Sequence, residues 1–147
     1  MTVFKHGSNM NRIRIFISHS YQYKEHYKTL KEWLNSANEF ELSDYSVPEE
    51  KELPANNKKK IEKELGKHIQ QCQIFIIPLG MYTVYSEWIE KEINIAKSYE
   101  KPILFVKPWG SEKTPKFAET FLKEYFFRTN LVGWKKESVI QGVKELV

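Results

Sequence analysis

The chain has 147 residues, of which 41% are hydrophobic and 14% aromatic, as is typical of one globular domain rather than of a disordered segment. Its 23 basic and 19 acidic residues give a formal charge of +4 but are interspersed, so no basic stripe points to a nucleic-acid partner. The single cysteine excludes an intrachain disulfide and a multi-cysteine metal site, and it suits a reducing cytoplasm.

Residues 1–11 are polar and without periodicity, so we expect a flexible N-terminal arm followed by a single domain over residues 12–147. The first ten residues have no apolar core of the kind that a signal peptide needs. No run approaches the ~20 apolar residues of a membrane span. We therefore expect a cytoplasmic protein without a membrane partner.

The first half of the domain alternates between strand and helix patterns. An apolar run predicts a strand over residues 12–18, helical spacing predicts a helix over 23–37, and alternation predicts a less buried strand over 40–45. Two prolines among polar residues then indicate an exposed loop over 46–57. The three-lysine run that follows is interpreted as the exposed start of a helix over 58–71 rather than as a phosphate site.

The same alternation continues after this helix. An unbroken apolar run predicts a third strand over residues 73–78, and a turn through Gly80 leads to a helix over 85–99 that Ser86 could cap. That helix must end just before Pro102, because proline disfavours helical backbone in the residue that precedes it.

The last part of the chain adds two more strands. A fully apolar strand is predicted over residues 103–106 and a mixed one over 126–132. Between them, Thr114 followed by Pro115 is typical of a helix start, and a short helix is expected there. A final helix is expected over 135–146.

Strands that alternate with helices predict an α/β fold with a parallel sheet covered on both faces. The first, third and fourth strands are continuously apolar, as interior strands are, whereas the second and fifth are mixed, as edge strands are. A flavodoxin-like, doubly wound, five-stranded sheet in the order 2-1-3-4-5 satisfies both conditions. Its ligand crevice would lie at the carboxyl ends of the first and third strands.

Glu92 is a charged residue on the apolar side of the predicted helix over residues 85–99, one turn after Trp88. Burying a carboxylate without partners costs roughly several kcal/mol, so we interpret this acid as either paired in the core or functional. What Glu92 faces is therefore the main question about function.

Three runs of residues carry a known pattern: Phe16-Ile17-Ser18-His19-Ser20-Tyr21, Asp44-Tyr45-Ser46, and Ser86-Glu87-Trp88-Ile89-Glu90-Lys91-Glu92-Ile93. Together they resemble the TIR domain family, and within it the TIR-like proteins of bacterial Thoeris anti-phage defence. The resemblance extends over about residues 12–143. It departs from many TIR domains at Ile89, where those have a cysteine after the motif tryptophan.

The resemblance implies cleavage of NAD between nicotinamide and ribose, with Glu92 as the catalytic residue. A carboxylate can stabilise the positive charge that develops on the ribose as this bond opens. NAD would be a substrate, because no Gly-x-Gly-x-x-Gly fingerprint of a redox cofactor site is present. No cofactor and no metal are expected.

By the same resemblance, substrate contacts are expected from residues near the crevice: Phe16, Ser18, His19, Ser20, Asp44, Ser46, Tyr85, Ser86 and Trp88. Structural roles stay open for some of them, since Trp88 could belong to the core and Asp44 could form a turn. His26, His68 and Cys72 are interpreted as structural.

The resemblance also implies a product of the cyclic ADP-ribose type that activates a separate effector, and activation by self-association or by a phage-derived trigger. Two alternatives stay open. One is a non-catalytic TIR-like scaffold that signals by assembly, and the other is a nucleoside-cleaving enzyme similar to deoxyribosyltransferases.

Overall fold

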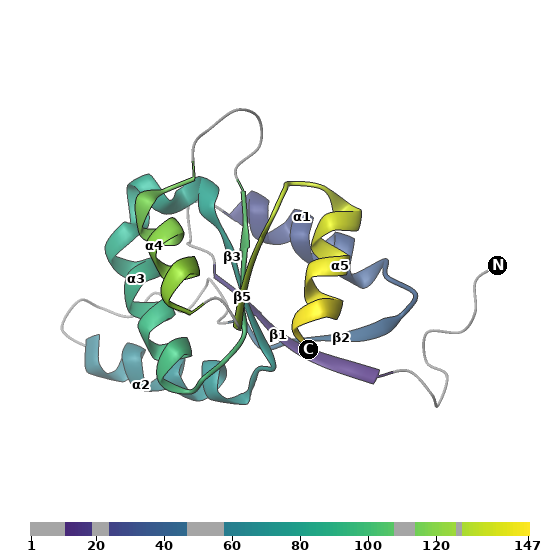
Figure 1. Ribbon diagram of the computed structural model, residues 1–147. Coiled ribbons are helices and arrows are strands. Elements are labelled where there is room, and N and C mark those ends of the chain that lie inside the picture. Colours follow the sequence, from purple (N-terminus) through teal and green to yellow (C-terminus); the bar gives the residue numbers. More distant parts are fainter. Residues whose placement is uncertain (1–10, 19–23, 47–57, 108–113, 126–127) are drawn as a thin grey trace.

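A parallel sheet of five strands lies at the centre of the structure, which is a computed structural model (Figure 1). The strand order β2-β1-β3-β4-β5 confirms the predicted flavodoxin-like arrangement. The strands are β1 (Asn11–Ile17), β2 (Phe40–Asp44), β3 (Ile74–Pro78), β4 (Ile103–Val106) and β5 (Thr129–Val132).

The structure describes residues 11–18, 24–46, 58–107, 114–125 and 128–147, with the backbone but not the side chains of 58–61 and 81–88. The predicted N-terminal arm up to residue 10, most of the predicted loop over 46–57 and the first two residues of the predicted fifth strand lie outside this part of the chain.

Helices cover both faces of the sheet. Figure 1 shows α2, α3 and α4 on one face and α1 and α5 on the other. The helical elements are α1 (Lys24–Asn35), α2 (Lys58–Gln71), the 3-10 turn η2 (Leu79–Met81), α3 (Tyr82–Ser98), α4 (Lys116–Glu124) and α5 (Lys136–Leu146).

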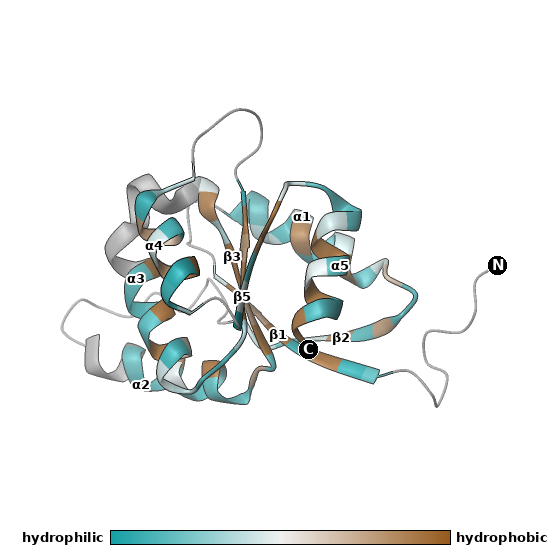
Figure 2. Cartoon of the chain, viewed as in Figure 1, coloured by the Kyte–Doolittle hydropathy of each residue, from teal (hydrophilic) through white to brown (hydrophobic). Residues whose placement is uncertain are grey.

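Each face of the sheet has its own apolar core, because successive side chains of a strand point to opposite faces. Phe16, Phe75 and Phe105 pack toward α2, α3 and α4, whereas Ile15 and Ile76 pack toward α1 and α5. Figure 2 shows hydrophobic (brown) strand segments between the two helical layers. Every residue of β3 and β4 is buried, as expected for interior parallel strands.

The third helix begins earlier than predicted, at Tyr82 rather than at residue 85, because η2 runs directly into it. Ser86 therefore lies in the second turn, and its predicted role as a cap is wrong. The chain can bend this tightly at Gly80, against which the His26 ring packs. A Cβ atom at that glycine would lie 2.7 Å from Cε1 of His26.

Smaller differences concern the ends of elements. Asn11 belongs to β1 rather than to the arm, and Pro115 rather than Thr114 occupies the cap position of α4, without a side-chain capping bond. The last strand starts at Thr129, because Arg128 is still part of a turn in which its N–H donates to the carbonyl of Tyr125.

The end of α3 has a left-handed residue that is not glycine. Glu100 has a φ of 56°, its N–H donates to the Lys97 carbonyl at 2.9 Å, and the Lys101 N–H donates to the Ala96 carbonyl at 3.0 Å. This pair of bonds is the Schellman motif, in which glycine is the usual left-handed residue.

We expect Glu100→Gly to raise the free energy of unfolding by about 0.5–1 kcal/mol, because the Cβ atom is strained at positive φ. Urea unfolding would measure the change. Asn94→Gly, at an exposed position within the same helix, is the matched control and should lower stability instead. Equal losses in both variants would contradict this reading of Glu100.

Candidate functional site

Ser18 and Glu92 form a buried hydrogen-bonded pair between β1 and α3. The Ser18 side chain follows Phe16 on the α3 side of the sheet, since alternate residues of a strand share a face. On α3, Glu92 lies beside Ile93 on the buried stripe. The Ser18 hydroxyl donates to Oε1 of Glu92 at 2.6 Å, and the two residues are 0% and 2% exposed.

The environment of Glu92 favours its protonated form. Burial raises the pKa of this carboxyl from 4.5 to about 8, while the hydrogen bond from Ser18 acts in the opposite direction. A carboxyl of this kind is a neutral acid near pH 7 and becomes a carboxylate when positive charge approaches. Perturbed acids of this type are concentrated at functional sites.

A second polar group lies at the end of β2. The Ser46 N–H donates to Oδ1 of Asp44 at 2.9 Å, the Tyr27 hydroxyl donates to Oδ2, and the Lys31 ammonium lies 3.2 Å from Oδ2. Burial tends to raise the pKa of Asp44, but hydrogen bonds from Ser46, Tyr27 and Lys31 outweigh it and lower the pKa. The Asp44 side chain thus closes a turn with Ser46, which is the structural role that the sequence left open for this residue.

The other predicted site residues lie in different surroundings. Phe16 is 1% exposed and stacks on Phe75 with 5.0 Å between ring centroids, so it is a core residue. Tyr85, Ser86 and Trp88 lie on the first two turns of α3, where the structure describes the backbone but not the side chains. His19 and Ser20 lie outside the described residues.

Tyr27 and Lys31 were not expected at the site. They stand one helical turn apart on α1, a spacing that lets two side chains reach a common partner, and this was the signal that could have identified them.

His26, His68 and Cys72 have structural surroundings, as predicted. His68 donates from Nδ1 to the Tyr45 carbonyl at 2.9 Å, and the His26 ring packs edge-on against Trp134. Burial raises the pKa of the Cys72 thiol to about 12, so this cysteine is not a thiolate nucleophile.

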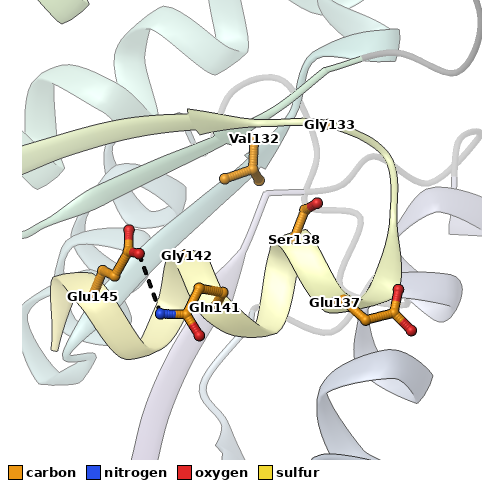
Figure 3. Close-up of a pocket in the computed structure, with 7 residues that line it drawn as sticks. All are labelled: Val132, Gly133, Glu137, Ser138, Gln141, Gly142 and Glu145. Atoms are coloured by element: carbon orange, nitrogen blue, oxygen red, sulfur yellow. Dashed lines mark hydrogen bonds between the residues drawn. The ribbon is translucent and has the colours of Figure 1, made fainter.

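Two open grooves lie elsewhere on the molecule. One, of about 370 Å³, is lined by β5 and α5 residues that include Glu137 and Glu145 (Figure 3). The other, of about 520 Å³, lies between α2 and α3 and is lined in part by Lys63, Lys67 and Tyr99. Neither is lined by Ser18 or Glu92, so the chemistry of the buried pair, not groove size, identifies the candidate site.

Within the described ranges, no three His, Cys, Asp or Glu side chains cluster as metal ligands would. No described helix is both long enough and apolar enough to cross a membrane.

Comparison with known proteins gives a family match and fold matches. The family model described as the Thoeris protein ThsB TIR-like domain matches residues 16–113. No functionally curated protein matches the sequence.

Two solved structures match this chain, and the first of them is similar in fold. One is the CMP N-glycosidase BcmB of Clostridium botulinum, with a TM-score of 0.54 and 16% identity, covering 89% of this chain and 98% of that protein. The other is CapF with the inhibitor 3-isopropenyl-tropolone, with a TM-score of 0.49 and 13% identity, covering 83% of this chain and 31% of CapF.

The raised pKa of Glu92 predicts a dependence of stability on pH. Between 4.5 and about 8 the folded chain holds a proton that the unfolded chain releases. The stability from this proton is complete below 4.5 and is lost as the pH rises through about 8. Relative to the wild type, Glu92→Gln should gain up to about 1.4 kcal/mol per pH unit across this window.

Urea unfolding of both proteins at several pH values would measure this difference. Glu119→Gln, which replaces an exposed acid of α4 and leaves the buried pair intact, is the control for removing a carboxylate. A stability difference between the wild type and Glu92→Gln that does not change with pH would show that the Glu92 carboxyl is not held protonated.

Proposed function

We propose that this chain, which belongs to the Thoeris ThsB TIR-like domain family, cleaves NAD at the nicotinamide–ribose bond, with Glu92 as the catalytic residue. The observation that carries the proposal is the Ser18–Glu92 pair: a carboxyl 2% exposed, with a 2.6 Å hydrogen bond, at the carboxyl end of an interior strand. This end of a doubly wound sheet is where such folds bind ligands.

The chemistry needs a negative charge next to the ribose. When the bond from C1′ to the pyridinium nitrogen breaks, its electron pair neutralises the nicotinamide, and positive charge passes to the ribose. An ionised Glu92 would stabilise that charge in a water-poor site. Attack by water, which then loses a proton, gives ADP-ribose, and attack by a hydroxyl or base nitrogen of the same molecule gives a cyclic product.

The raised pKa of Glu92 fits this reaction. The cationic nicotinamide ring favours the carboxylate, so binding of NAD would itself drive the loss of the proton from Glu92. At 2% exposure the carboxyl cannot meet a ligand without rearrangement around it. This agrees with an enzyme that is activated by a phage-derived trigger or by self-association.

The substrate contacts we propose come from residues around this pair. Ser18 would exchange its bond to Glu92 for a ribose hydroxyl, with Phe16 as the apolar support behind it. His19 and Ser20 follow Ser18 in the chain, and Tyr85, Ser86 and Trp88 belong to the first turns of α3. The product, a cyclic ADP-ribose or a related nucleotide, would activate a separate effector in the cytoplasm.

A second candidate function is cleavage of the base–sugar bond of a nucleotide such as CMP, the activity that the name of BcmB states. A departing cytosine is helped by a proton, and a Glu92 with a pKa of about 8 could supply one. The two reactions therefore need opposite forms of Glu92. A third possibility is a TIR-like scaffold that signals by assembly without turnover.

The test is to incubate the purified protein with NAD or with CMP, with and without lysate of phage-infected cells, and to follow nicotinamide and cytosine by mass spectrometry. We expect nicotinamide release, and a loss of at least about a hundredfold in Glu92→Gln. Glu90→Gln, which changes a less buried acid of the same helix, is the matched control and should keep its activity.

The pH dependence separates the candidates. NAD cleavage by ionised Glu92 should become faster as the pH rises toward about 8, whereas CMP cleavage by the acid form should become slower. Full activity of Glu92→Gln would refute the catalytic assignment. No release of either base under any condition would favour the scaffold.

A further inference from the structure

Side chains link the end of β1 to the residues that follow β2. Among the described residues, the last backbone bond of the ladder between these strands runs from the Tyr45 N–H to the Ile15 carbonyl at 2.7 Å. In a parallel ladder the next bond would join the Ile17 N–H to the Tyr45 carbonyl. Instead, the Ile17 N–H donates to the Ser46 hydroxyl at 2.8 Å, and the Tyr45 carbonyl accepts from His68.

Ser46 is itself held in place by Asp44. Oδ1 of Asp44 accepts the Ser46 N–H at 2.9 Å, and its Oδ2 is held by the Tyr27 hydroxyl and by Lys31 at 3.2 Å. Because Tyr27 and Lys31 both belong to α1, this helix fixes the carboxylate, and the carboxylate fixes the turn. The turn presents the Ser46 hydroxyl to β1.

The two successive peptide groups on either side of Ile17 are therefore held from the two neighbouring strands. Ser46 holds the Ile17 N–H on the β2 side, and the Ser18 N–H donates to the Ile76 carbonyl of β3 at 2.8 Å. The Ser18 side chain is short, so its hydroxyl moves with the second of these peptides, which follows directly on the one that Ser46 holds. That hydroxyl is the group that donates to Glu92 at 2.6 Å.

We infer that Asp44 and Ser46 are positioning residues: they hold the end of β1 so that the Ser18 hydroxyl stays on the Glu92 carboxyl, and they do not contact the substrate. This inference rests on the proposed function for its effect on turnover. It replaces the substrate-binding role that the family resemblance implied for these two residues.

The first test separates positioning from substrate binding. Ser46→Ala removes the acceptor for the Ile17 N–H, so kcat for nicotinamide release should fall by about tenfold or more while KM changes by less than about twofold. Ser46→Thr keeps a hydroxyl and should restore most of kcat. Ser43→Ala is the matched control on the same strand, since the Ser43 hydroxyl accepts only a 3.3 Å bond from the exposed side chain of Arg12 among the contacts described.

The second test needs no turnover. The carboxyl carbon of Glu92, observed by ¹³C NMR, should shift in Ser18→Ala because its hydrogen bond is lost. Ser46→Ala should move this signal toward the Ser18→Ala position, and Ser43→Ala should leave it unchanged.

Two results would overturn the inference: a Glu92 signal in Ser46→Ala identical to that of the wild type, or a raised KM with unchanged kcat, which would make Ser46 a substrate contact. A wild type that releases no nicotinamide refutes the proposed function alone, because the NMR comparison still decides the inference.

Discussion

The structure depends on one unfavourable placement, a carboxyl side chain inside the apolar layer between the sheet and α3. Glu92 occupies a helix stripe that otherwise holds Ile89, Ile93 and Ala96, all fully buried. The fold tolerates this acid because Ser18 donates a hydrogen bond to it and because burial keeps it neutral near pH 7. The same two conditions make the protonation of this carboxyl sensitive to a cationic ligand. One group therefore affects both the stability of the fold and the proposed chemistry.

Much of the fold could be predicted from the sequence because the strands differ in apolar content. Strands β3 and β4 are apolar at every position, which places them inside the sheet, and the mixed β2 and β5 fall at the edges. The ends of elements were harder to predict, because short turns decide them. The 3-10 turn η2 has no strong sequence signal. Because of this turn, α3 begins at Tyr82, ahead of the cap expected at Ser86.

The candidate site was predictable in part for a related reason. Glu92 was identifiable because a charge on an apolar helix stripe is conspicuous, and Ser18 because it ends an apolar strand. The contacts that hold Ser46 were harder to predict, because the helical spacing of Tyr27 and Lys31 does not show which partner they share, and Asp44 on β2 meets them only in the folded chain. The roles of Asp44 and Ser46 therefore could not be read from the motif that contains them.

The packing of His26 on Gly80 joins the two helical layers at the carboxyl edge of the sheet. His26 lies on α1, while Gly80 belongs to the turn that leads into α3 on the other face, and the Trp134 ring also packs against His26. A side chain at position 80 would need a smaller residue at position 26. In evolutionary terms, these two positions should vary together among relatives, although 54 residues separate them in the chain (80 minus 26).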